Sequence, residues 1–252
     1  MSRNERKLFD CFNRHMLSPR DIVEQAVAFT LSGAPPVDVI KRDFSKYVMG
    51  AEEEAYRIFL EAQKPAWVNG INDYIIQLGG PDHQAAKARF LSDNFTELDS
   101  FFLSLSQSRR VRAGGAFQSI IKYLFRRLDY PFSEEPIING QPDFLLPNVE
   151  YYREFPVDCI IFTVKRTLRE RWRQIVTEGT RGQSFHLATI DNSITVNQLG
   201  EMAANRIYLV VPDAIKNNTR NYRAAVNVMS FESFFEDILD VKMRAWRKKG
   251  VV

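Results

Sequence analysis

A chain of 252 residues, 45% hydrophobic and 26% charged, is long enough to bury a full core and has the composition of a globular protein. The formal net charge is only +3, which excludes a globally basic nucleic-acid binder, so any basic surface must be local. Cys11 and Cys159 belong to no CxxC or Cys/His metal pattern, which fits a reducing compartment.

Helical periodicity dominates the first 108 residues. Ser18 before Pro19 predicts an N-cap, and apolar residues then recur at helical spacing up to Thr30. Further amphipathic stretches predict helices over about residues 37–48, 52–63, 83–91 and 95–106, with breaks at Pro35-Pro36 and Gly79-Gly80-Pro81. The sequence therefore predicts an N-terminal helical subdomain over residues 1–108.

The hydrophobic period changes at residue 109. A basic, glycine-containing loop is predicted over Arg109–Gly115, and an amphipathic helix follows up to about Leu128. Strands are then predicted at about 136–146, 156–165, 184–190 and 206–212, with helices at about 168–178 and 194–204 and a last one from Ser230. This order predicts an α/β core over residues 109–252, in which helices flank a small mixed sheet.

Several classes of protein lack their sequence signals here. The N-terminal residues contain no apolar signal-peptide core, and no run approaches the roughly 18 apolar residues of a membrane span. The histidines His15, His83 and His186 are scattered, and neither a Walker A loop nor a GxGxxG motif is present. We therefore expect a cytoplasmic protein without a membrane partner, a zinc site, a hydrolytic triad or a nucleotide-binding loop.

Three residues of the second half could build a metal-assisted nuclease site. They are Asp143 in Gln-Pro-Asp-Phe, Lys165 at the end of an apolar strand, and Glu178 near the end of the following predicted helix. Phosphodiester hydrolysis needs carboxylate oxygens to hold a hard divalent cation such as Mg²⁺, and a positive group to offset developing charge. Asp143, Glu178 and Lys165 supply these parts.

The order of these residues resembles the PD-(D/E)xK nuclease superfamily, with one displacement. In that superfamily the second carboxylate stands two residues before the lysine, a position that Thr163 occupies here. The pattern Pro142-Asp143, Thr163-Val-Lys165 and Glu178 is similar to the SsoII, PspGI and EcoRII group of restriction endonucleases. In the SsoII and PspGI branch the glutamate is displaced onto the following helix, which implies that Asp143 and Glu178 bind the metal.

The same resemblance implies a fold, a reaction and a recognition segment. It implies a restriction-endonuclease-like core and Mg²⁺-dependent cleavage of double-stranded DNA that leaves 5′-phosphate ends. It also implies that Arg169, Glu170 and Arg171 read a CC…GG core, such as CCNGG or CCWGG. Their chemistry agrees, because arginine bonds bidentately to guanine and glutamate accepts from cytosine. The resemblance is clear over about residues 109–180; where related enzymes often carry a glutamate on the first core helix, this chain has Gln118.

Other basic and aromatic residues are candidates for contacts with DNA. Backbone phosphates could be contacted by arginines of the predicted loop and of the recognition region, namely Arg109, Arg110, Arg112, Arg166 and Arg173. Such a basic run is more commonly a solvated face. Trp67 falls in a predicted loop, where an indole could stack on a flipped base, although partial burial is the more common fate of such a tryptophan.

A double-strand cut at a nearly palindromic site suits a homodimer, because two equivalent sites then face the two strands. The 1–108 subdomain would contribute DNA contacts and dimerisation, and a cognate DNA methyltransferase would complete a restriction-modification system. Two alternatives stay open. One is a repair or recombination nuclease on the same core, and the other is a sequence-specific DNA-binding protein without catalysis.

Overall fold

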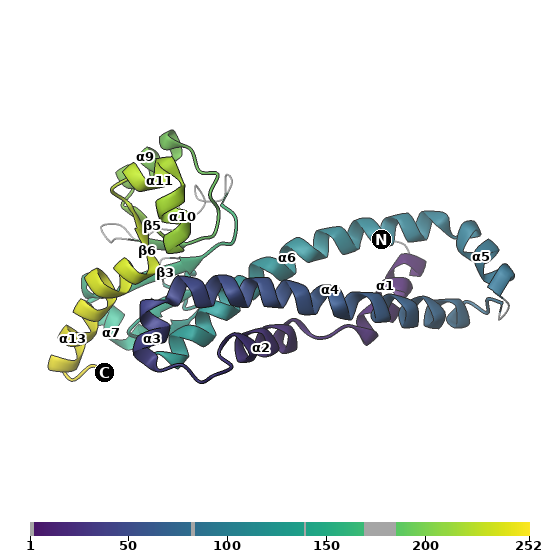
Figure 1. Ribbon diagram of the computed structural model, residues 1–252, viewed down its shortest axis with the longest axis horizontal. Helices are drawn as coiled ribbons and strands as arrows, with labels where there is room; N and C mark the ends of the chain where they lie inside the picture. Colours follow the sequence, from purple (N-terminus) through teal and green to yellow (C-terminus); the bar gives the residue numbers. More distant parts are fainter. Residues whose placement is uncertain (1–2, 82–83, 139, 169–184) are drawn as a thin grey trace. The chain divides into compact units, whose positions relative to one another are not determined.

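The computed structural model describes residues 3–81, 84–138, 140–168 and 185–252, and Figure 1 presents them as a ribbon. The predicted helix over about 168–178 therefore lies outside the described residues, apart from Leu168. The chain forms two compact units: unit 1 comprises residues 1–29 and 52–116, and unit 2 comprises residues 30–51 and 117–252. No helix in the described ranges is both long and apolar enough to cross a membrane.

The described secondary-structure elements of unit 1 are all helices. Its elements are α1 (Arg3–His15), α2 (Pro19–Thr30), α5 (Gln84–Asp93) and the parts of α4 (Phe44–Gln77) and α6 (Phe95–Arg127) that fall within its ranges. The predicted N-cap is confirmed, since the Asp21 amide donates to Ser18 Oγ at 3.1 Å. A core forms around Phe12, Tyr74 and Phe101, which are fully buried.

Trp67 does not lie in a loop, as the sequence analysis expected, but inside α4. The sequence analysis ended this helix at about residue 63, and a proline disfavours a helix interior, yet α4 continues through Pro65. The helix is held here by packing, because a Cβ on Gly70 would come within 2.7 Å of Phe12 Cα. Trp67 is half-buried, and its indole stacks on Phe101 with the ring centroids 5.2 Å apart.

The predicted loop over Arg109–Gly115 is also helical. It lies in the middle of α6, which joins two stretches that the sequence analysis treated as separate helices. Gly114 and Gly115 suggested a loop, but a glycine inside a helix costs only about 1 kcal/mol relative to alanine, and the surrounding residues favour a helix. The predicted subdomain boundary at residues 108 and 109 therefore falls within one continuous helix.

Unit 2 contains a six-stranded mixed sheet. Its strands in spatial order are β1 (Ser133–Glu134), β2 (Phe144–Leu146), β3 (Ile160–Val164), β4 (Phe185–Ala188), β5 (Ile207–Val211) and β6 (Val228–Ser230). The first three pair antiparallel, and β3 to β6 pair in parallel. The prediction of a mixed sheet flanked by helices, with a helical region before it, is confirmed.

Helices cover both faces of this sheet. The described helical elements of unit 2 besides α4 and α6 are α3 (Val37–Arg42), α7 (Val149–Glu154), η1 (Pro156–Asp158), α9 (Val196–Ala204), α10 (Asp213–Asn218), α11 (Arg220–Ala224), α12 (Phe231–Ser233), η2 (Phe234–Leu239) and α13 (Asp240–Lys248). On one face, Leu187 and Leu209 pack with residues of α9 and α11, which lie beside β5 and β6 (Figure 1). On the other face, Phe162 contacts Phe125 of α6 and Phe234 of η2.

Strands β2 and β3 are shorter than the strands predicted over about residues 136–146 and 156–165. The chain turns after Leu146, and Asn148 caps α7 by accepting a hydrogen bond from the Tyr151 amide at 2.8 Å. Pro156 then begins the short helix η1. The sequence analysis extended a strand back to residue 156, where a cap and a proline favour helical turns instead.

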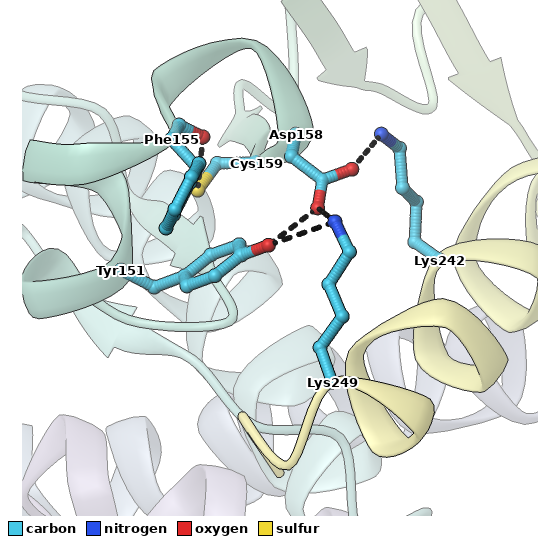
Figure 2. A network of polar contacts seen from close by, with 6 residues as sticks. All are labelled: Tyr151, Phe155, Asp158, Cys159, Lys242 and Lys249. Carbon is cyan, nitrogen blue, oxygen red and sulfur yellow. Dashed lines mark hydrogen bonds and ion pairs between the residues drawn. The ribbon is translucent and has the colours of Figure 1, made fainter.

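The C-terminal helix α13 is tied to the amino end of β3 by a polar network that Figure 2 displays. The carboxylate of Asp158 accepts from Lys242 Nζ at 2.7 Å, Lys249 Nζ at 2.9 Å and the Tyr151 hydroxyl at 2.6 Å. Burial would raise the pKa of Asp158, but these three donors outweigh it and hold the pKa well below its usual range. Burial also raises the pKa of the neighbouring Cys159 thiol to about 12, so this cysteine is a structural residue.

Candidate active site

The structure brings two of the three predicted catalytic residues into contact. Asp143 directly precedes β2, and Lys165 directly follows β3. Because β2 and β3 are antiparallel, with Phe144 opposite Phe162, the start of β2 lies beside the end of β3. Lys165 Nζ lies 3.2 Å from Asp143 Oδ2, which makes an ion pair at the carboxyl end of β3.

The Asp143 carboxylate is nearly buried, and several donors hold it. The residue is 7% exposed, whereas the Lys165 side chain is 37% exposed. Besides Lys165, the Thr163 hydroxyl and the Val164 amide both donate to Oδ2 at 2.6 Å. The sequence analysis treated Thr163 only as a missing carboxylate and overlooked it as a donor. The sequence does contain a signal for this contact: Thr163 has a hydroxyl and stands two residues before the lysine, on the same strand face.

A second polar cluster fixes the chain as it leaves β3. The Leu168 amide donates to Asp191 Oδ2 at 2.9 Å, and the Thr189 hydroxyl donates to the Arg166 carbonyl at 3.2 Å. Asp191 is itself buried, and its Oδ1 accepts from the Ser193 amide and hydroxyl. The sequence analysis did not identify this cluster, although Asp-Asn-Ser after a strand is a common turn signal.

The remaining predicted nuclease and recognition residues are not described. Glu178, Arg169, Glu170, Arg171 and Arg173 all lie within residues 169–184, outside the described ranges. Gln118 lies on α6, and its amide donates to Glu135 Oε1 at 3.3 Å. The Glu135 amide in turn donates to the Asp143 carbonyl at 3.0 Å. Glu135, in the loop after β1, therefore links the Gln118 side chain to the Asp143 backbone.

The arginines predicted to contact phosphates differ in their settings. Arg109 is exposed on α6, and Arg110 lies on the same helix. Arg112 is half-buried: its guanidinium donates to Asn13 Oδ1 at 3.0 Å and lies over the Phe59 ring, and burial lowers its pKa. A structural role within unit 1 accounts for Arg112. The Arg166 side chain is half-buried at the end of β3.

The described residues contain no group of three or more histidine, cysteine or acidic side chains that could hold a metal ion. His186 lies on β4 with its ring against Tyr208 and Phe234, and burial lowers its pKa to about 4. It is therefore neutral near pH 7 and belongs to the core. Of the predicted cation ligands, the described residues supply Asp143.

Comparison with known sequences gives a consistent family match. The family model described as EcoRII C terminal matches residues 83–235. The type II restriction enzyme EcoRII of Escherichia coli is 31% identical over 155 residues, which are 57% of this chain and 38% of that enzyme. The type II restriction enzyme SsoII of Shigella sonnei is 31% identical over 166 residues, which are 60% of this chain and 52% of that enzyme. The matches thus span about half the length of these relatives or less.

Comparison with solved structures supports the fold. A structure of metal-depleted Ecl18kI in complex with uncleaved DNA superposes with a TM-score of 0.80 at 23% identity, covering 99% of this chain and 86% of that one. A complex of restriction endonuclease PspGI with substrate DNA gives a TM-score of 0.69 at 20% identity, covering 92% and 96% of the two chains. At these identities the likeness establishes the restriction-endonuclease-like fold that the sequence analysis predicted.

Proposed function

The chain belongs to the EcoRII C-terminal family, and on that basis we propose that it is a type II restriction endonuclease, which cuts both strands of double-stranded DNA at a short, specific sequence. The observation that carries the proposal is the ion pair of Asp143 and Lys165 at the carboxyl end of β3. A buried carboxylate beside a half-exposed lysine supplies a cation ligand and a positive group, two of the parts that metal-assisted phosphodiester hydrolysis uses.

Mg²⁺ is the cofactor that this chemistry favours. Within the described residues, the hydrogen bonds to the Asp143 carboxylate all end on Oδ2, which leaves Oδ1 as an oxygen ligand for a hard cation. Asp143 and Glu178 would hold the ion, and a bound Mg²⁺ would supply Lewis acidity toward the phosphate and toward water. The Lys165 ammonium would stabilise the negative charge that develops on the phosphate, and hydrolysis would leave 5′-phosphate ends.

Base reading is assigned to Arg169, Glu170 and Arg171, which begin one residue beyond the anchored Leu168. Their side chains match guanine and cytosine edges, so we propose a site with a CC…GG core. Arg109, Arg110, Arg166 and Arg173 are proposed phosphate contacts. Arg112 is a weaker candidate because its guanidinium contacts Asn13 and Phe59. Stacking of Trp67 on a flipped base stays a prediction, although Trp67 lies in a helix and not in the loop that motivated it.

The assembly follows from the reaction. One catalytic site per chain and two strands to cut favour a homodimer on a site of matching symmetry, with the helical region contributing DNA contacts and dimerisation. A restriction enzyme also needs a methyltransferase that protects the host sites, and both would act in the cytoplasm.

Digestion of plasmid DNA with Mg²⁺, followed by sequencing of the fragment ends, tests the function directly. Discrete bands with ends at one short sequence support a restriction enzyme. Smeared products or cuts at branched DNA would instead favour a repair nuclease. Tight, specific binding without cleavage would favour a regulator.

The recognition segment makes a separate prediction. Arg169→Ala or Arg171→Ala should weaken binding to a CCNGG duplex by about 1–3 kcal/mol, because each bidentate contact to guanine is lost. Affinity for random duplex, which depends on phosphate contacts, should hardly change. Competition binding in Ca²⁺ at several salt concentrations measures both quantities.

Arg153→Ala is the matched control, since Arg153 is an exposed arginine on α7, at the amino end of β3. It should leave the preference for the site unchanged. Equal weakening of cognate and random binding by Arg169→Ala and Arg171→Ala would mean that the segment clamps the backbone.

A further inference from the structure

Thr163 stands where the superfamily pattern places the second carboxylate, yet its side chain is engaged. It is 3% exposed, and its hydroxyl donates to Asp143 Oδ2 at 2.6 Å. Since successive side chains of a strand alternate between faces, Thr163 and Lys165 lie on the same side of β3. The residue at this position is therefore a direct partner of Asp143.

Among the described residues, the three donors to the Asp143 carboxylate are consecutive residues at the end of β3. The Val164 amide is fixed by the strand backbone, and Lys165 Nζ is the end of a long, half-exposed side chain. The Thr163 hydroxyl is the short, buried side-chain donor of the set, and its β-branched side chain restricts the χ1 rotation. Removing it would leave one backbone bond and one long lysine to hold the carboxylate.

A neutral donor also suits the electrostatics of this arrangement. A carboxylate at position 163 would lie within hydrogen-bond distance of Asp143, and the two negative charges would repel each other without a cation between them. A hydroxyl donates to Oδ2 instead and leaves Oδ1 without a donor from the described residues. The side chain at this position thus supports the Asp143 carboxylate, where the superfamily pattern places a second carboxylate.

We propose that Thr163 is a positioning residue, which fixes Asp143 through Oδ2 so that Oδ1 is presented to a divalent cation. The inference rests on the proposed function, because it assigns Asp143 to the cation. Partners that orient a metal ligand commonly change metal affinity by about 10- to 100-fold when they are removed. A threonine that only satisfied a buried polar group would affect stability and leave the affinity for the cation unchanged.

The test is the affinity of the full chain for Mn²⁺, measured by calorimetry without DNA. Thr163→Val keeps the shape and removes the hydroxyl, and it should weaken Mn²⁺ binding by about tenfold or more. Thr163→Ser keeps the hydroxyl and should stay within a few-fold of the parent chain. The Mg²⁺ concentration for half-maximal cleavage should rise with Thr163→Val, while the rate at saturating Mg²⁺ should fall less.

Thr195→Val provides the matched control, because Thr195 caps α9 by accepting from the Gln198 amide and does not bond to Asp143. It should lower stability without altering Mn²⁺ affinity. If Thr163→Val does not fold, Thr163→Ala compared with Thr163→Ser gives the same contrast, with thermal unfolding recorded for each variant.

Mn²⁺ binding by Asp143→Asn distinguishes failure of the Thr163 proposal from failure of the proposed function. If Asp143→Asn binds Mn²⁺ as well as the parent chain does, the assignment of the cation to Asp143, and with it the proposed chemistry, is wrong. If Asp143→Asn weakens binding but Thr163→Val does not, Thr163 is only a structural residue and the proposed function stands.

Discussion

Replacing Asp143 by asparagine is expected to lower the rate of DNA cleavage by about a thousandfold or more, and Lys165→Ala and Glu178→Ala should do the same. The amide keeps the shape of the carboxylate but removes the negative charge that a cation and Lys165 require. Because the proposed role of these groups is in the chemistry and not in docking, binding of the cognate duplex in Ca²⁺ should change little. Single-turnover cleavage and binding assays measure the two effects.

The network in Figure 2 supplies matched controls for this experiment. Asp158 and Lys242 form an ion pair of the same chemistry at the opposite end of β3. Asp158→Asn and Lys242→Ala should lower stability but leave the cleavage rate of the folded protein near that of the parent chain. Normal cleavage by Glu178→Ala would show that the second carboxylate comes from elsewhere.

Phe125→Ala is expected to lower the free energy of unfolding by about 3–5 kcal/mol. Phe125 is fully buried on α6, and its ring lies 5.4 Å from that of Phe162 and 6.0 Å from those of Phe144 and Phe44. The substitution removes the ring and leaves a cavity among side chains fixed on three different elements. Urea denaturation followed by circular dichroism measures the loss.

Phe155→Ala controls for the loss of a phenylalanine in the same unit. Phe155 is 50% exposed between α7 and η1, so its truncation should cost about 1 kcal/mol or less. Similar costs for the two variants would contradict the central position of Phe125. Phe144 and Phe162 adjoin Asp143 and Thr163, and Phe125→Ala should therefore also lower cleavage at temperatures well below its unfolding midpoint.

Much of the fold could be predicted because hydrophobic periodicity is a local property. Ser18 and Pro19 correctly predicted the start of α2, and the apolar run before Lys165 correctly predicted β3. The alternation of strands and helices in the second half predicted the mixed sheet, and the resemblance to the EcoRII group is confirmed by the family match. These features depend on neighbours in sequence.

The errors arose where packing overrides local preference. Pro65 and the Gly114-Gly115 pair are helix breakers in isolation, yet both lie inside long helices. The free-energy cost of one unfavourable residue is small compared with the free energy gained from the apolar surface that a continuous helix buries along its length.

The residues of the candidate site also differ in how far the sequence predicts them. The Asp143 and Lys165 pair could be predicted because the two residues match the PD-(D/E)xK pattern, and the structure shows them in contact. The sequence contains weak signals for the Thr163 hydroxyl and the Asp191 carboxylate, but it does not specify their partners. Those partners depend on contacts between separate segments of the fold: β3 with the start of β2, and the exit from β3 with the turn after β4.

The hydrogen bonds from the Leu168 amide to Asp191 and from Thr189 to the Arg166 carbonyl have an evolutionary consequence. They hold the backbone from Lys165 to Leu168, so substitutions beyond Leu168 need not displace the lysine. If Arg169, Glu170 and Arg171 read bases as we propose, members of the family can diverge in the sequence they read while the proposed catalytic pair stays intact. New specificities would then arise by point substitution, without rebuilding the catalytic centre.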